Sequence, residues 1–182
     1  MIEKTLSRKN IFHGKILDVY VDEVLLPNGK KAIREVVEHC SSVACIAALT
    51  PRNEVLFVKQ FRYPFKEIFL ELPAGKLDGD EPLECAKREL LEETGAVGED
   101  FVSLGEMYPT VSFCKAAYHL FACKISEFKK PKPDDDEFLE ILKIPLDEAV
   151  KMVLNGEIPD AKTQIGILKL KALKEDNCRV SF

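Results

Sequence analysis

Residues 71–95 read ELPAGKLDGDEPLECAKRELLEETG, which is a short loop followed by a segment with the period of a helix. Pro82 suits the first turn of that helix, because the N–H that proline lacks would have no partner there. Apolar side chains then recur at the spacing that forms one stripe along a helix, at Leu83, Ala86 and Leu90. Gly95 ends the pattern, since glycine readily adopts the left-handed conformation of a C-cap. The sequence therefore predicts a helix over residues 82–94.

Three glutamates, Glu89, Glu92 and Glu93, crowd the end of this predicted helix. Each like-charged pair costs about a few tenths of a kcal/mol, and the negative end of the helix dipole disfavours each carboxylate by about 0.3 to 1 kcal/mol. Glu89 and Glu93 lie roughly 80° and 40° from the centre of the apolar stripe, and Glu92 lies roughly 140° away. We therefore expect Glu89 and Glu93 to meet the sheet and Glu92 to reach water.

A hard divalent cation would offset this crowding of negative charge. Mg²⁺ takes oxygen ligands, keeps several waters and binds alongside phosphate oxygens. The alternative is a solvated acidic helix end beside Arg88, which is the usual state of a charged run. The glycine-containing loop before the helix favours the metal site.

The rest of the chain has mainly the pattern of strands. Alternating segments at 16–24 and 32–38 are joined by Pro27-Asn28-Gly29, a hairpin-turn sequence, and residues 43–49 and 55–58 are apolar throughout, as in strands buried on both faces. Further strands are expected at 69–72, 102–107, 118–124 and 138–144, and two more helices at 147–155 and from residue 161, the latter capped by Asp160. The predicted fold is an α/β sandwich with a mixed central sheet and helices on both sides, residues 40–182, preceded by a small antiparallel sheet, residues 1–39.

Composition and charge narrow the class of protein. The chain has 182 residues, and its longest apolar run, 43–49, is far shorter than the roughly 20 residues of a membrane-spanning helix. Its N-terminus has no apolar core behind its charges, so we expect a cytoplasmic protein without a membrane partner. A net charge of −5 with scattered lysines and arginines argues against a nucleic-acid surface. The six cysteines include no CxxC pair, and we expect reduced, mostly buried thiols.

The loop and helix resemble the box of the Nudix hydrolase family. The segments Arg88-Glu89-Leu90, Glu92-Glu93 and Gly95 match the second half of the box in register. The first half is one residue short, and a gap between Asp78 and Gly79 puts Asp80 where the family has Glu. Ala96 fills the final aliphatic position.

Motifs over nearly the whole chain resemble the ADP-ribose pyrophosphatase branch, at residues 26–30, 58–64, 71–75, 145–149 and 160–163. The resemblance implies that the metal ligands are Glu89, Glu93, the backbone carbonyl of Ala74, and Glu92. It also implies that Arg62 binds substrate phosphate and that Glu71 helps hold the metal-bound substrate or its sugar. For Arg62 the alternative is an exposed cation at a strand end. Three residues depart from the branch: Val111 replaces a proline, and Lys115-Ala116 replaces an acidic pair.

The activity implied is Mg²⁺-dependent hydrolysis of the diphosphate linkage in a nucleoside diphosphate sugar, foremost ADP-ribose, with Mn²⁺ as an alternative metal. The products are a nucleoside monophosphate and a sugar phosphate. Two other functions stay open: hydrolysis of another diphosphate, such as a dinucleotide or coenzyme, and a Nudix-fold module that binds a nucleotide sugar without cleaving it. A zinc site is not expected, because His13, His39 and His119 are far apart, and Cys114 near His119 is read as structural.

We also expect a general base and a partner subunit. The catalytic set is Glu89, Glu93 and Glu137. Because a metal-bound carboxylate is a poor proton acceptor, the base is sought in the acidic loop 134–140. Related pyrophosphatases place a catalytic Glu before Phe-x-Glu, which points to Glu137, with Asp135 second and Glu140 third; the alternative is a solvated acidic loop. The branch also forms dimers through its N-terminal sheet, so we expect a homodimer.

Overall fold

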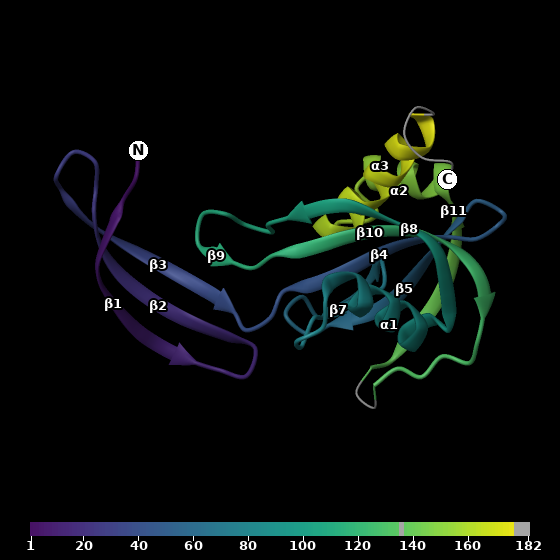
Figure 1. The fold of residues 1–182 in the computed structure, drawn as a ribbon, viewed down its shortest axis with the longest axis horizontal. Coiled ribbons are helices and arrows are strands. Elements are labelled where there is room, and N and C mark those ends of the chain that lie inside the picture. The colour runs from purple at the N-terminus through teal and green to yellow at the C-terminus, as the bar shows by residue number, and fades with distance from the viewer. Residues whose placement is uncertain (135–136, 177–182) are drawn as a thin grey trace. The chain divides into compact units, whose positions relative to one another are not determined.

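We analysed a computed structural model of the chain, which describes residues 1–134 and 137–176. Its strands are β1 (Lys4–His13), β2 (Leu17–Leu25), β3 (Lys31–His39), β4 (Val43–Leu49), β5 (Glu54–Arg62), β6 (Glu67–Glu71), β7 (Ala74–Lys76), β8 (Ala96–Met107), β9 (Cys114–Lys115), β10 (Tyr118–Phe128) and β11 (Leu139–Pro145). Its helices are α1 (Pro82–Thr94), α2 (Leu146–Leu154) and α3 (Ala161–Glu175). The chain divides into an N-terminal unit, residues 1–42 with 108–117, and a second unit formed by 43–107 with 118–182 (Figure 1).

The N-terminal unit is a four-stranded sheet in the order β1-β2-β3-β9. β1, β2 and β3 pair antiparallel, and the predicted Asn-Gly turn joins β2 to β3, with Gly29 at a φ of 79°. Three strands were not anticipated: β1 and β9 in this sheet, and β7 in the second unit, which lies in the predicted loop. Every residue of β1 is exposed, so no face of it had to be apolar and no alternation marks it in the sequence. β9 pairs parallel with β3 and brings Val111 and Lys115 into this unit.

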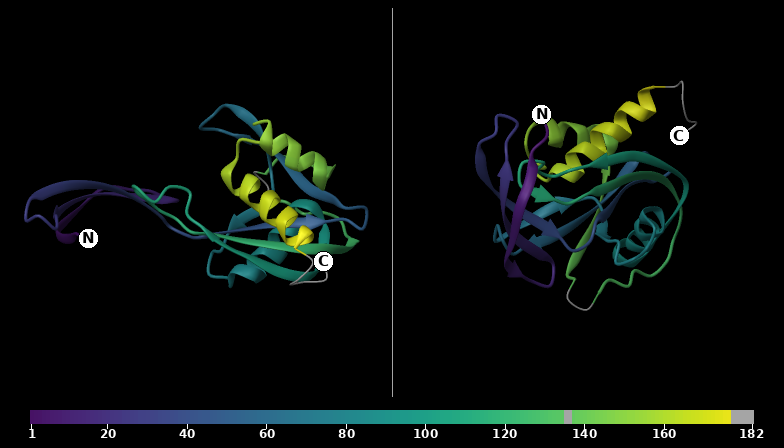
Figure 2. Two further views of the ribbon diagram at one scale, coloured as in Figure 1. Left: turned by 90° about the horizontal axis from the view of Figure 1, so that it is seen from above. Right: turned by 60° about the vertical axis from the view of Figure 1, so that its left-hand side comes forward.

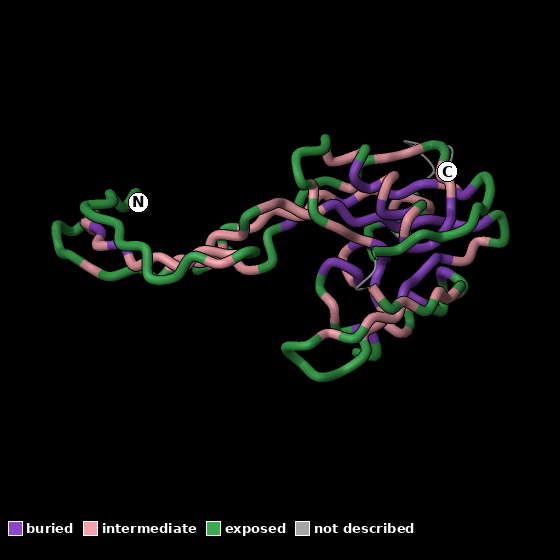
Figure 3. The backbone as a smooth tube through the Cα atoms, turned by 90° about the horizontal axis from the view of Figure 1, so that it is seen from below, coloured by how far each residue is buried: buried purple, intermediate pink, exposed green. Residues whose placement is uncertain are grey.

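This small sheet has little core of its own. Of its described residues only Asp22 and Val24 are buried, and the Asp22 carboxylate is paired with Arg8 at 2.8 Å. Large apolar side chains stay exposed, among them Ile11, Phe12 and Ile33. Figure 3 shows the consequence, since buried residues gather in the second unit and are few along the N-terminal strands.

The second unit is built on a seven-stranded mixed sheet with the path β11-β5-β4-β10-β8, with β6 paired to β5 and β7 paired to β4. β4 and β10 run parallel, and the other pairs are antiparallel. The mixed sheet is therefore confirmed. β8 starts at Ala96, six residues before the strand expected from the sequence, because the left-handed Asp100 and several register shifts interrupt its alternation.

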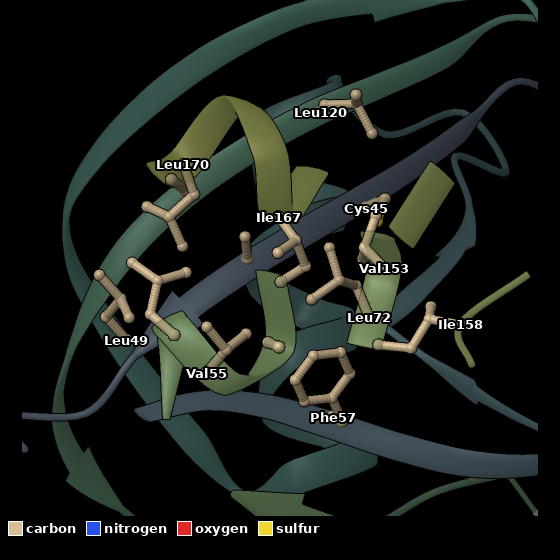
Figure 4. Close-up of a cluster of buried hydrophobic side chains, with 14 of the residues drawn as sticks. Cys45, Leu49, Val55, Phe57, Leu72, Leu120, Val153, Ile158, Ile167 and Leu170 are labelled. Carbon is tan, nitrogen blue, oxygen red and sulfur yellow. The ribbon is translucent and has the colours of Figure 1, made fainter. Parts of the chain in front are cut away.

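Helices cover both faces of this sheet, as predicted. Figure 1 and the right-hand view of Figure 2 show α1 on one side and α2 with α3 on the other. The side chains of β4 alternate between two cores: Ala44, Ile46 and Ala48 pack with Leu90 of α1, whereas Cys45, Ala47 and Leu49 pack with residues of α2 and α3. Figure 4 shows the second of these cores, in which Ile167 and Leu170 of α3 face Leu49, Val55 and Phe57.

The helix ends agree with the sequence prediction. Pro82 begins α1, and Gly95 ends it at a φ of 71° with its N–H donating to the Leu91 carbonyl at 2.8 Å. Asp160 caps α3 by accepting a hydrogen bond from the Thr163 N–H at 3.0 Å. Among the described helices, none combines the length and the hydropathy needed to cross a membrane. All five described cysteines are unpaired and three are buried; Cys178 lies outside the described residues.

Candidate active site

A pocket of about 660 Å³ opens in the second unit, beside the N-terminal half of the predicted box. It brings together segments that are far apart in the chain: the end of β5, the loop after it, β7, α1 and the residues that precede α3. Five of the predicted site residues contribute to its lining, Arg62, Glu71, Ala74, Glu89 and Glu137. Glu92 and Glu93 do not line it.

Glu89 and Glu93 lie on the inner face of α1, as the helical angles predicted. Their residues are 8% and 3% exposed, whereas the Glu92 side chain is 39% exposed. The Glu93 carboxylate accepts a hydrogen bond from the Ala74 N–H at 3.2 Å, which joins the helix to β7. Glu89 packs against Gly75, where even a Cβ atom would overlap the carboxylate. A side chain at position 75 would therefore displace the Glu89 carboxylate.

The buried carboxylates have strongly disturbed acidities. Burial, with the nearby charges of Glu137 and Glu89, raises the pKa of Glu93 to about 9. Burial also raises the pKa of Glu89, although the guanidinium of Arg88 opposes the shift. Among the described residues no ion pair neutralises Glu93. This arrangement is costly without a positive counter-charge.

Arg88 and a tight turn hold the loop before α1. Asp78 and Gly79 both have positive φ angles, 46° and 100°, which allow the short turn at the position of the missing residue. Asp80 accepts a hydrogen bond from Arg88 Nε at 3.0 Å, so it interacts with the box arginine from the place where the family has Glu. The buried Cys85 thiol donates to the Lys76 carbonyl at 3.2 Å and fixes the loop on the helix.

The carboxylates of Glu89, Glu92 and Glu93 are donors that suit a hard divalent cation, although those of Glu89 and Glu92 are bonded to Arg88. Arg88 Nη1 donates to Glu89 at 2.8 Å and to Glu92 at 2.9 Å. As these side chains stand, residues 1–134 and 137–176 contain no group of three His, Cys, Asp or Glu side chains arranged to hold a metal. Oxygen donors and two buried carboxylates with raised pKa values are nevertheless the chemistry that a divalent cation stabilises.

Arg62 and Glu71 are paired with each other at one wall of the pocket. Arg62 Nε and Nη2 each donate to the Glu71 carboxylate at 2.6 Å. Glu71 also accepts a hydrogen bond from the buried Lys162. Burial would raise the pKa of Glu71, but the hydrogen bonds from Arg62 and the charge of Lys162 outweigh it and lower that pKa.

The acidic loop supplies Glu137 to the pocket. This carboxylate is near enough to raise the pKa of both Glu89 and Glu93, and it accepts a hydrogen bond from the Asp134 N–H at 3.4 Å. Glu140 is exposed, does not line the pocket and pairs with Lys59 at 3.5 Å. Asp135 lies outside the described residues.

Several residues of the pocket were not predicted from the sequence. Phe65 and Phe69 line it with their rings 5.2 Å apart, and Asp160 and Lys162 line it from the start of α3. Within the motif at 160–163, the sequence predicts Asp160 as a helix cap and gives Lys162 no role. No period marks a buried lysine next to a helix cap, so only the fold could bring Lys162 to Glu71.

Comparisons with known proteins agree with this fold. Residues 38–164 match the family model of the NUDIX domain, and residues 3–37 match that of the nucleoside diphosphate sugar hydrolase N-terminal domain. The chain is 41% identical over 176 residues to the ADP-ribose pyrophosphatase of Bacillus subtilis (strain 168), covering 95% of this chain and 94% of that protein. It is 37% identical to the methanol dehydrogenase activator of Bacillus methanolicus, covering 93% and 92%.

A solved structure shows the same fold. The crystal structure of an ADP compounds hydrolase superposes with a TM-score of 0.88 and covers 99% of this chain and 98% of its own, at 16% sequence identity. The chain belongs to the Nudix hydrolase family. It is a hydrolase of that family with the N-terminal domain of the nucleoside diphosphate sugar hydrolases. Nudix hydrolases generally require a divalent metal ion.

Proposed function

We propose that this hydrolase cleaves the diphosphate linkage of ADP-ribose, in the presence of Mg²⁺, to AMP and ribose 5-phosphate. The observation that carries the proposal is the grouping of the acidic residues Glu89 and Glu137 with Arg62 and the Phe65–Phe69 rings around one pocket. Carboxylates suit a cation, a guanidinium suits a phosphate, and aromatic rings offer an apolar surface to a nucleobase. ADP-ribose is the substrate named for the relative at 41% identity.

The metal ligands in this proposal are Glu89, Glu92, Glu93 and the backbone carbonyl of Ala74. Bound there, Mg²⁺ or Mn²⁺ would offset substrate charge and polarise a phosphoryl oxygen. Arg88 would then give up part of its pairing with Glu89 and Glu92 and keep its hydrogen bond to Asp80. The raised pKa of Glu93 supports this role, because a positive ion would stabilise its ionised form.

The remaining roles fall to Glu137 and Arg62. Glu137 is the proposed general base, which takes the proton of the attacking water; its place in the pocket lining supports it over the exposed Glu140. Arg62 is proposed to bind substrate phosphate. Its hydrogen bonds to Glu71 use Nε and Nη2, which leaves Nη1 outside that pair.

We further propose a cytoplasmic homodimer that uses the N-terminal sheet. A sheet with only two buried residues among those described, and with exposed isoleucines and phenylalanines, gains stability by covering that apolar surface. Unpaired cysteines in the described chain are compatible with a reducing compartment.

A substrate panel tests the activity. The protein is incubated with Mg²⁺, Mn²⁺ or a chelator and with ADP-ribose, ADP-glucose, GDP-mannose, UDP-glucose and NADH, and released monophosphates are separated by ion exchange. We expect AMP from ADP-ribose, fastest of the panel, and none with the chelator. Preferential cleavage of NADH would favour the dinucleotide alternative. Binding of ADP-ribose without cleavage of any compound would favour the binding module.

A further inference from the structure

A row of four alternating charges, with Glu71 and Lys162 buried and Arg62 and Asp160 partly exposed, links the pocket to the start of α3. The Lys162 side chain is 9% exposed and the Glu71 side chain 4% exposed. Lys162 Nζ donates to Glu71 Oε2 and, at 2.9 Å, to Asp160 Oδ2. Glu71 in turn accepts both hydrogen bonds from Arg62. Positive and negative side chains therefore alternate in the order Arg62, Glu71, Lys162 and Asp160.

Hydrogen bonds fix the backbone on both sides of this row of charges. Asp160 accepts hydrogen bonds from the Thr163 N–H at 3.0 Å and from its hydroxyl at 2.6 Å. The same hydroxyl oxygen accepts a hydrogen bond from the Leu72 N–H at 2.9 Å, next to Glu71. Two parts of the chain separated by 91 residues are thereby held together at the ammonium of Lys162.

The charge of Lys162 is stabilised by its neighbours. Burial would lower its pKa, but the carboxylates of Asp160 and Glu71 outweigh burial and raise it. Removing one partner of a buried ion pair leaves the other charge without compensation, so each group of the pair depends on the other for its stability. The position of Glu71 therefore depends on Lys162 as well as on Arg62.

We propose that Lys162 is a positioning residue, which fixes the Glu71 carboxylate and through it orients the Arg62 guanidinium toward the substrate diphosphate. The side chain of Arg62 is 40% exposed and lines the pocket, so an orienting partner decides how its remaining donors face a ligand. Lys162 itself is not assigned a chemical step. The effect on substrate rests on the proposed function, whereas the effect on Arg62 does not.

A substrate-free measurement tests the orientation directly. The Arg62 Nε–H resonance is followed in a nitrogen–proton correlation spectrum of the full-length protein, assigned by its loss in Arg62→Met. In the wild type we expect slow exchange with water, because the Nε–H is bonded to Glu71. Lys162→Met should broaden or remove that resonance. The matched control is Lys59→Met. Lys59 lies on β5, the strand of Arg62, and its exposed pair with Glu140 is not part of the pocket, so this variant should leave the resonance unchanged.

Kinetics test the consequence for substrate. For Lys162→Met we expect the KM for ADP-ribose to rise about 10- to 100-fold, the effect of a weakened hydrogen bond to a charged group, with kcat changed less than about threefold. In an Arg62→Met background the same change should have almost no further effect on KM, because both substitutions act through one guanidinium. Additive effects would overturn the proposal.

A second variant keeps the test valid if Lys162→Met does not fold. Asp160→Asn removes one of the two carboxylates that hold Lys162 and should produce the same changes in smaller measure. A sharp Arg62 resonance in a folded Lys162→Met, or in Asp160→Asn if the former does not fold, would overturn the proposal. If the wild-type protein cleaves none of the panel compounds, the proposed substrate is wrong, but the Arg62 resonance still tests the role of Lys162.

Discussion

Gly75 lies so close to Glu89 that a single methyl group on its α carbon would occupy the space of the Glu89 carboxylate. The space between the loop and the helix therefore admits only the hydrogen atom of glycine at this position while Glu89 stays where it is. The proposed metal ligand keeps its place only while position 75 has no side chain.

Gly75→Ala should reduce kcat/KM at least about 100-fold, because a displacement of about 1 Å in a catalytic group can cost this much. The added methyl group has to push Glu89 away from the pocket. Activity on ADP-ribose and thermal unfolding are measured together. Gly29→Ala is the control: its glycine has open space around it and a φ of +79°, so it should cost stability but not activity. Wild-type activity in Gly75→Ala would show that Glu89 is not needed where it lies.

Glu93→Gln and Glu89→Gln should each slow turnover at least about 100-fold, since a bound metal contributes several kcal/mol to the transition state. The fold should remain, and the free energy of unfolding without metal should stay the same or rise, because glutamine cannot ionise and burial and nearby carboxylates disfavour the ionised glutamate. Mg²⁺ should raise the melting temperature of the wild type but not of Glu93→Gln. Glu84→Gln is the matched control, since Glu84 is an exposed residue of the same helix, paired with Lys87. Full activity in Glu93→Gln would contradict the proposed ligand set.

Glu137→Gln should lower kcat by roughly 10² to 10⁴, the usual effect of losing a general base, while substrate and Mg²⁺ still bind. Single-turnover kinetics and calorimetry separate the two effects. Glu140→Gln, which changes an exposed carboxylate three residues away, should lose less than about tenfold. A small effect of Glu137→Gln with a large effect of Asp135→Asn would move the base to Asp135.

Light scattering of the full-length protein at micromolar concentration should give a mass near twice 20.5 kDa. Ile33→Glu places a charge on an exposed apolar residue of the N-terminal sheet and should shift the protein toward the monomer. Leu168→Glu, on an exposed position of α3, should leave the mass unchanged. A wild-type monomer with full activity would refute the dimer.

The local sequence pattern was sufficient to predict the helices and strands that bury one or both of their faces. The Leu83/Ala86/Leu90 stripe and Gly95 defined α1, and the continuous apolar run 43–49 defined a strand buried on both faces. The same helical period predicted that Glu89 and Glu93 lie inside and that Glu92 lies nearer to water. These properties repeat along a few turns or a few residues, so they are visible without the rest of the chain.

The contacts between distant segments could be decided only by the tertiary structure. The pairing of Lys162 with Glu71, the approach of Glu137 to Glu89 and the strands β1 and β9 leave no period in the sequence. β1 is exposed along its whole length, so burial selected no pattern there. In the sequence, Arg62, Glu71 and Lys162 are three separate charged residues. They form one hydrogen-bonded network because the fold brings the end of β6 against the start of α3.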